Sequence, residues 1–463
     1  MHDPSGKGQR GDEATRGIFD AAAQPTGFLG FSRYQWLVIA AAWLGWGFDV
    51  FDALLFNFVA PNCIPTLLGL TPGTPEARAP TVFWTGVMSS MLLIGWAIGG
   101  VLFGMLADRW GRRRVLLATI LLYSVGTGLC ALAADLWQLM IFRGLASLGI
   151  GGEWAVGAVM VAEAVPESKR VAAGAIMQSA SPTGLVLATF VNYMVAGVWL
   201  ADSPTTSWRF VFLCGLIPAA VALFVRLYLH ESERFTAASQ KAPPVPLRAL
   251  LSPAIRARTA SGLGTAVAAL LTWWSCNAFM PILATGFAQE HAAALGLDAG
   301  GTRALAESWK ATAGVWFNVG GLLGTFLAIP LAWRFGRRTI FTVYFALSLV
   351  SIVTVFGGPL EPLERLYGFF FIGFSVFGIF GTFPFYLPEL FPTRLRATGA
   401  GLCYNLGRII ASGGTFVVGM VTARAGGSAG ELAQTLLWVA VIPLLGLIGA
   451  RFIVETRGAR LPE

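Results

Sequence analysis

The chain alternates between long apolar segments and short polar ones, a pattern that predicts a helical membrane protein. A helix needs about 20 apolar residues to cross a hydrocarbon core of about 30 Å. Twelve segments are long enough, and the third and fourth are separated only by a short stretch at Asp135. The expected spans are 34–61, 82–107, 114–134, 136–160, 171–199 and 208–229 in the first half, and 258–288, 309–333, 339–357, 364–387, 398–423 and 432–455 in the second.

Two motifs recur in both halves of the chain and indicate an internal repeat. The basic turn GMLADRWGRRR at 104–114 has a counterpart, AWRFGRRT, at 332–339. The sequence EAVPESKRVAAG at 163–174 has a counterpart, ELFPTRLRATGA, at 389–400. Both pairs share nearly the same offset, about half of the chain. A chain that builds one membrane hairpin twice is typical of a pseudosymmetric transporter.

The expected fold is therefore an all-α membrane protein with two pseudosymmetric six-helix bundles. A polar, proline-rich stretch separates the sixth and seventh spans and reads as a linker. The expected organisation is a tail at 1–33, a bundle at 34–229, a linker at 230–257, a second bundle at 258–455 and a short tail at 456–463.

The distribution of basic residues predicts the orientation. Most of the 32 Lys and Arg residues fall in segments that are cytoplasmic if both termini lie in the cytoplasm. The segments then expected outside hold few of them, namely Arg78, Arg303, Lys310, Arg365 and Arg424, with Arg209 at a helix start. By the positive-inside rule, the protein is a multi-pass protein of the cytoplasmic membrane with both termini and the linker inside.

Composition narrows the function. The chain is 56% hydrophobic and 12% charged, whereas soluble domains carry about a quarter charged residues. The net charge of +8 lies in short loops rather than in one patch, which argues against nucleic acid as a partner. The five cysteines are scattered without a CxxC pair, so no metal or cofactor is expected. HxxxH does not occur, which argues against a metal-dependent enzyme, and twelve spans in two matched halves fit a carrier better than a channel or a receptor.

The first repeated motif resembles the signature loop of the major facilitator superfamily. The stretches RGLASLGIGGEW at 143–154 and PELFPTRLRATGAGLCYNLGR at 388–408 resemble its proton symporters for organic acids, especially those for sialate and monocarboxylates. The resemblance implies alternating access and proton coupling. It implies a monomer that moves a small anion such as lactate or pyruvate, with an aromatic-acid or sialate symporter or a sugar porter as alternatives.

The resemblance also implies that the basic loops gate the carrier at its cytoplasmic face. The chain departs from the pattern in the second half, where Trp333 stands at the position that corresponds to Asp108. The expected gating residues are Asp108, Arg109, Gly111, Arg112, Glu163 and Arg170 in the first half and Arg337, Glu389 and Arg396 in the second.

Acidic residues inside spans are the candidates for proton coupling, because charges in a bilayer are costly and mark function. Asp49 and Asp52 lie three residues apart, on roughly one face of the first span. Two close buried carboxylates do not both ionise easily, so one is expected to hold a proton near neutral pH. The three histidines fall outside the spans. Glu153, in the fourth span, is a third candidate. The alternative is that one Asp braces the bundle through Arg143.

Arg408, in the eleventh span, is the candidate anchor for a substrate carboxylate, since a guanidinium offers a planar fork of donors. An anion is thereby favoured over a neutral sugar. The alternative role for Arg408 is a structural ion pair. Further candidate binding residues are Asn405, Tyr404, Arg143, Gln178, Asn277, Asn318 and Tyr386.

Overall fold

A computed structural model describes residues 30–110, 112–166, 169–217, 220–221, 247–392 and 395–457. Within these residues the chain is helical, with short turns between the helices. The first half contains α2 (Arg33–Leu67), α3 (Pro75–Trp110), α4 (Arg112–Cys130), α5 (Leu136–Ala164), α6 (Arg170–Gln178), α7 (Ala180–Asn192), the π-helix η4 (Tyr193–Trp199) and α8 (Pro204–Cys214).

The second half repeats this plan. Its elements are η5 (Leu247–Leu251), α11 (Arg256–Ala294), α12 (Ala299–Phe335), α13 (Arg337–Ile352), η6 (Val353–Gly357), α14 (Pro362–Ile372), η7 (Gly373–Phe377), η8 (Gly378–Thr382), α15 (Phe383–Glu389), α16 (Arg396–Ala425), α17 (Ala429–Trp438), α18 (Val441–Gly449) and η9 (Ala450–Phe452).

The helices match the expected spans in order. In the described part of the chain, nine helical stretches are long and apolar enough to cross a membrane. Two shorter apolar helices, at 117–130 and 136–151, fall in the third and fourth expected spans. The sixth span begins in α8, and its remainder lies largely outside the described residues.

Side-chain caps set several helix starts that hydropathy alone left vague. Ser32 and Gln35 form a capping box at the start of α2. Asp135 accepts a hydrogen bond of 2.8 Å from the backbone N–H of Gln138, so it ends the α4–α5 turn and begins α5. Such caps satisfy backbone donors that the first helical turn leaves without partners.

The eighth span is longer than hydropathy predicted. Its helix, α12, begins at Ala299 rather than near residue 309, because Asp298 caps it through the N–H of Gly301 at 2.7 Å. The charged segment that was expected outside the membrane, with Lys310, is therefore part of this helix. Lys310 lies inside α12 and is 1% exposed.

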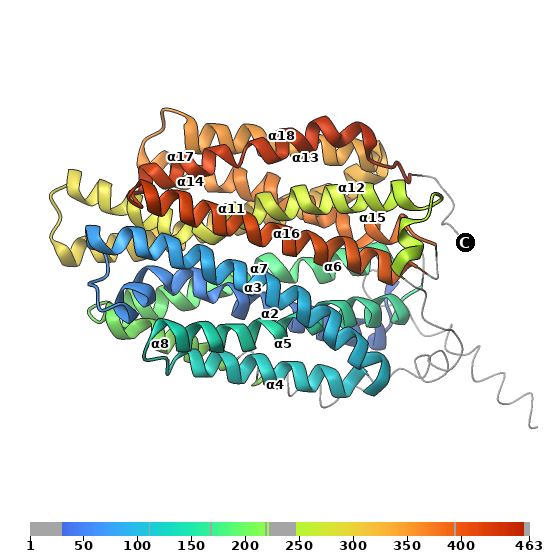
Figure 1. Cartoon of the computed structure of the whole chain (residues 1–463), viewed down its shortest axis with the longest axis horizontal. Helices are drawn as coiled ribbons and strands as arrows, with labels where there is room; N and C mark the ends of the chain where they lie inside the picture. The colour runs from blue at the N-terminus through green and yellow to red at the C-terminus, as the bar shows by residue number, and fades with distance from the viewer. Residues whose placement is uncertain are drawn as a thin grey trace, which may run out of the picture.

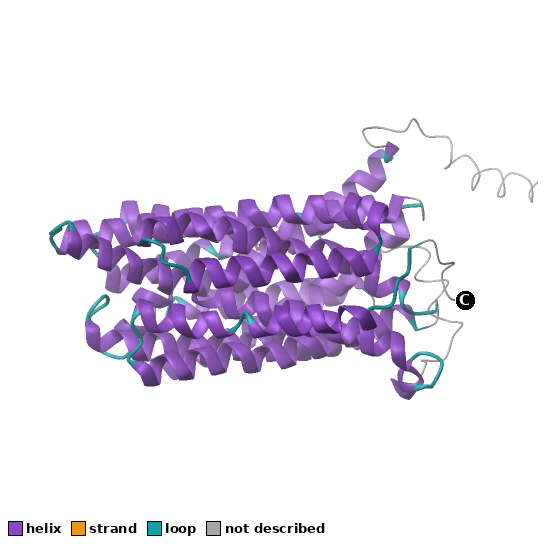
Figure 2. Cartoon of the chain, turned by 90° about the horizontal axis from the view of Figure 1, so that it is seen from above, coloured by secondary structure: helices purple, strands orange, loops and turns teal. Residues whose placement is uncertain are grey.

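The helices of the two halves lie side by side along one long axis, and the connections lie at the two ends (Figures 1 and 2). The halves meet where α2, α3 and α7 pack against α11, α16 and α12. The loops that join α2 to α3 and α11 to α12 share the end opposite the C-terminus (Figure 1). We call this end external and the other cytoplasmic, following the predicted orientation.

Candidate transport site

Arg408 lies near the middle of α16, at the boundary between the halves, and is 3% exposed. Its guanidinium carbon is 4.4 Å from the ring centre of Trp96, which belongs to α3 in the first half. It is 4.7 Å from the ring of Tyr404, one helical turn away. Asn405 accepts a hydrogen bond of 3.1 Å from Nη1. The predicted trio of Tyr404, Asn405 and Arg408 is thus one cluster, to which Trp96 adds a second aromatic face.

The aromatic surface around Arg408 continues across the boundary between the halves. The ring of Trp96 lies 6.0 Å from that of Trp46 in α2 and 6.1 Å from that of Trp274 in α11. Trp273 is next to Trp274, with their ring centres 4.8 Å apart. Indole rings at this point offer large flat faces to a cation or a planar ligand.

Buried amides lie at the same boundary. Asn57 of α2 donates a hydrogen bond of 3.4 Å to Asn277 of α11, so the pair joins the two halves. Asn57 Oδ1 and Asn277 Nδ2 are buried and make no hydrogen bond, and neither does Oδ1 of Asn318. Gln178 ends α6 and is 7% exposed. Polar atoms buried without a partner are costly, and a polar ligand would satisfy them.

Asp49 and Asp52 are both buried in α2, at 0% and 1% exposure. Oδ2 of Asp52 accepts a hydrogen bond of 2.7 Å from Thr127 of α4, whereas its Oδ1 is buried without a hydrogen bond. Arg143 of α5 donates to the main-chain oxygens of Asp52, at 3.4 Å, and Ala53, at 2.7 Å. Arg143 is thus held against the backbone of α2 at Asp52, as a brace between helices.

Tyr386 lies apart from the Arg408 cluster. Its hydroxyl is 2.7 Å from that of Ser261, and the Ser261 hydroxyl accepts a hydrogen bond from the backbone N–H of Val454. Its ring packs on Phe341 at 4.9 Å. These contacts place Tyr386 inside the second half, toward the cytoplasmic end. Its assignment to the substrate stays a prediction.

At the cytoplasmic end, the structure pairs two of the predicted gating residues. Arg337 donates to both carboxylate oxygens of Glu389, at 3.0 and 2.7 Å, and Thr456 donates to the same carboxylate at 2.6 Å. Arg396, the first residue of α16, is half-buried. The side chains of Asp108, Arg109, Arg112, Glu153, Glu163 and Arg170 lie outside the described residues, as does Gly111 entirely.

Glu455 caps the start of α13 from the far end of the chain. Its carboxylate accepts hydrogen bonds from the backbone N–H groups of Arg337, Arg338 and Arg457, at 3.0, 3.1 and 2.9 Å. Partial burial opposes ionisation of this carboxyl, but the three N–H donors and the charge of Arg337 outweigh it and lower its pKa below the usual value.

The glycine of the second basic motif makes room for this cap. Gly336 has a backbone φ of 93°, a conformation that residues other than glycine rarely adopt. A Cβ atom built there would lie 2.6 Å from Glu455 Oε2. The motif's glycine therefore serves both the backbone turn and the cap.

Several buried residues escaped sequence reasoning. Glu307 and Lys310 form a buried ion pair in α12, with Nζ 2.6 Å from Oε1. Their i,i+3 spacing is typical of an ion pair on one helix. The pair was missed because the eighth span was predicted to begin only near residue 309. Asn57 is a single amide in an apolar segment, and such a residue is only weak evidence for a binding site. Trp96 becomes significant only through its contact with Arg408, which joins two distant helices.

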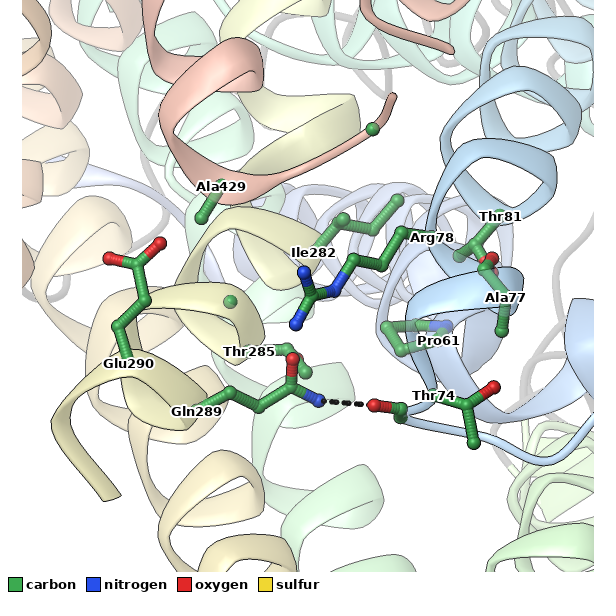
Figure 3. A pocket seen from close by; sticks show the side chains of 13 residues that line it. Pro61, Thr74, Ala77, Arg78, Thr81, Ile282, Thr285, Gln289, Glu290 and Ala429 are labelled. Atoms are coloured by element: carbon green, nitrogen blue, oxygen red, sulfur yellow. Dashed lines mark hydrogen bonds between the residues drawn. The ribbon is translucent and has the colours of Figure 1, made fainter. Parts of the chain in front are cut away.

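A small pocket lies between the halves at the external end. It holds about 100 Å³ and is lined by residues of α2, the α2–α3 loop and α3 on one side and by α11 and the start of α17 on the other. Figure 3 shows Arg78, Gln289 and Glu290 around it, with Gln289 donating to the main-chain oxygen of Gly73 at 3.5 Å. Neither Arg408 nor the aromatic side chains around it line this pocket, so we do not assign the substrate to it.

Two helical bundles with charged and aromatic groups buried where they meet define a membrane carrier rather than an enzyme. The chain belongs to the Major Facilitator Superfamily, whose family model matches residues 35–415. It is 31% identical over 420 residues to a "probable 4-methylmuconolactone transporter" of Cupriavidus pinatubonensis, with 90% of each chain covered. It is 27% identical to the sialic acid transporter NanX of Escherichia coli, covering 79% of this chain and 82% of the relative.

Among solved structures, the chain is similar to the xylose transporter XylE of Escherichia coli in a partially occluded inward-open conformation. The TM-score is 0.70 at 20% identity, with 93% of this chain and all of the other covered. The predicted fold, twelve helices in two bundles, is confirmed. The protein is a multi-pass membrane protein and a secondary transporter of small organic metabolites. The exact limits of the bundles, linker and tails stay predictions.

The Glu455 cap generates a prediction about stability and pH. Glu455→Gln should lower the unfolding free energy at pH 7 by about 0.5–1 kcal/mol, the lower part of the range for capping groups, since Glu455 is exposed. Because the folded-state pKa is lowered, this stabilisation is complete above the unfolded value of about 4.3 and is lost as the pH falls through the folded value. The melting temperatures of parent and variant should therefore converge below pH 4. A constant difference across that range would show that Glu455 does not act through its charge. Glu290→Gln, at the exposed external end of α11, is the matched control.

Proposed function

We propose that the protein carries a small organic acid anion together with protons, by alternating access of one central site to the two sides of the membrane. The observation that carries this proposal is Arg408, a cation buried between the two halves and flanked by Trp96 of the opposite half. Burying a guanidinium is costly, and such groups in membrane proteins mark substrate or ion pathways. A carboxylate is the substrate group that such a site recognises best.

The position of Arg408 also supports alternating access. One of its aromatic neighbours, Tyr404, shares its helix, while the other belongs to the opposite half. An anion bound here would touch both halves and draw them together. When the halves rock, the contact with Trp96 changes and the contact with Tyr404 does not, so the affinity of the site would differ between states.

Asp49 and Asp52 are the proposed proton carriers. Asp52 has one carboxylate oxygen that is buried without a hydrogen bond, and a proton on that oxygen would relieve the cost of burying the charge. Arg143, held nearby by main-chain oxygens, supplies a fixed positive charge that opposes protonation. The balance between these two effects lets one carboxyl take up and release a proton during transport.

The substrate is proposed to be a monocarboxylate, such as lactate or pyruvate. The rings of Trp96 and Tyr404 on either side of the guanidinium, with Trp274 beyond them, favour a second candidate, a flat acid such as an aromatic one. Flat acids would stack on these rings while the carboxylate meets the guanidinium. The sialic acid transporter among the relatives supports the carboxylate class and not the choice between the two candidates.

One prediction of the proposed function concerns proton coupling. Asp49→Asn or Asp52→Asn should abolish uptake driven by a pH gradient, because neither variant releases a proton at that position. At least one of them should still exchange substrate in counterflow, which needs binding but no net proton movement. Asp135→Asn, an exposed cap where Asn also caps, is the matched control and should transport normally. Normal pH-driven uptake in both Asp49→Asn and Asp52→Asn would contradict the assignment.

Another prediction of the proposed function concerns Arg408. Arg408→Ala should weaken binding of the acid by about 2–5 kcal/mol, the cost of losing one partner of a buried charged contact. Arg408→Lys keeps the charge but loses the fork, so it should weaken binding by a smaller factor, about tenfold. Calorimetry on the purified variants measures both. The control is Arg451→Ala, an exposed arginine at the cytoplasmic end. If Arg408→Ala binds the acid as tightly as the parent, the anchor lies elsewhere and Arg143 is the next candidate.

A further inference from the structure

We propose that Glu307, together with Asn62 and Asn192, forms a latch that holds the external ends of the two halves closed and opens for the outward-facing state. The proposal rests on alternating access, as proposed above, but on neither the identity of the acid nor proton coupling. It assigns a conformational role to a buried ion pair that the central site does not use.

The hydrogen bonds of Glu307 cross between the halves. Glu307 lies in α12, and its Oε1 accepts a hydrogen bond of 3.1 Å from Nδ2 of Asn62 in α2. Its Oε2 accepts one of 3.1 Å from Nδ2 of Asn192 in α7. Lys310, its ion-pair partner, donates to the main-chain oxygen of Phe58 in α2 at 3.4 Å. One acidic side chain and its partner thus bind two helices of the opposite half.

This geometry differs from that of a brace within one half. The Glu307–Lys310 pair itself lies on a single helix and remains intact when the halves separate. What is lost on separation is the set of bonds from Asn62, Asn192 and Lys310 across the boundary. A charged donor or acceptor makes each of these bonds stronger than a neutral one, while water replaces them when the end opens. The net cost of opening is therefore modest, as a reversible latch requires.

The latch sits above a tightly packed seam. Two helical turns inward from Glu307, a Cβ atom at Gly314 would lie 2.5 Å from Oγ1 of Thr189 in α7. Glycine at this position lets α12 and α7 approach closely. Thr189 is 1% exposed and lies on the path that external water would follow if these two helices parted. It therefore reports on the state of the latch.

A weaker hydrogen bond also joins the two halves at this end of the molecule. Gln289 of α11 bonds to Gly73 in the α2–α3 loop across the small external pocket (Figure 3). That bond is long and exposed, and its acceptor is uncharged. The Glu307 cluster is deeper and charged, so we assign the latch to it rather than to Gln289.

The test measures how fast a cysteine at position 189 reacts with a membrane-impermeant thiol reagent added from outside. The background carries Thr189→Cys and Cys214→Ala, because Cys214 is half-buried and the other four native cysteines are buried. Asn62→Asp places a second carboxylate against Glu307. It should open the end and raise the labelling rate at least about fivefold, the low end of conformational coupling effects. Asn62→Leu, which only removes the donor, should raise the rate by a smaller factor.

The controls separate the latch from misfolding and from the proposed transport function. Glu290→Gln removes a charge from the exposed external end of α11 and should leave the labelling rate unchanged. Circular dichroism and size-exclusion profiles identify variants that fold. Parental or slower labelling in folded Asn62→Asp or Asn62→Leu overturns the latch, even if acid transport is intact. Faster labelling supports it, even if the protein turns out not to transport an acid.

Discussion

The cost of placing charge inside a membrane governs this molecule. Asp49, Asp52, Arg143, Arg408, Glu307 and Lys310 are all buried within helices of a chain that is otherwise strongly apolar. Groups that reduce this cost surround three of them: main-chain oxygens around Arg143, aromatic rings around Arg408, and amides around Glu307. Arg408 and Glu307 receive part of this compensation from the opposite half, which makes their environment depend on how the halves are arranged. Charge burial is therefore coupled to conformation.

Among the side chains that the structure describes, those at the two ends of the molecule use their charges differently. At the cytoplasmic end, Arg337, Glu389, Thr456 and Glu455 bind one another within the second half and fasten the chain after η9 to α13 and α15. At the external end, Glu307 binds across the halves. The first arrangement moves as a unit with its bundle, whereas the second has to break when that end opens. This difference follows from which helices supply the donors, and not from the type of charged group.

The sequence predicted the architecture well, because hydropathy reports on the spans and the repeated motifs report on the two matched halves. It also predicted the Tyr404–Asn405–Arg408 cluster, since neighbours on one helix follow from i,i+3 and i,i+4 spacing. Trp96 was not predicted, because its contact with Arg408 joins helices that sequence spacing does not relate. The burial of Lys310 was missed for a different reason. Hydropathy ended the span where charged residues began, while the capped helix continues to Ala299 and buries those charges against amides from α2 and α7.

The central claim is that Arg408, buried between the two halves, binds an organic acid, and that buried carboxyls of α2 couple its movement to protons. The most direct test is accumulation of radiolabelled acids by proteoliposomes that contain the purified protein, with the outside made acidic. The account predicts that lactate, pyruvate or a flat acid such as benzoate accumulates above its passive level, and that a protonophore abolishes this accumulation. It also predicts that glucose does not accumulate. Accumulation of glucose but of none of these acids, or of an acid to the same level with and without the pH gradient, would contradict the account.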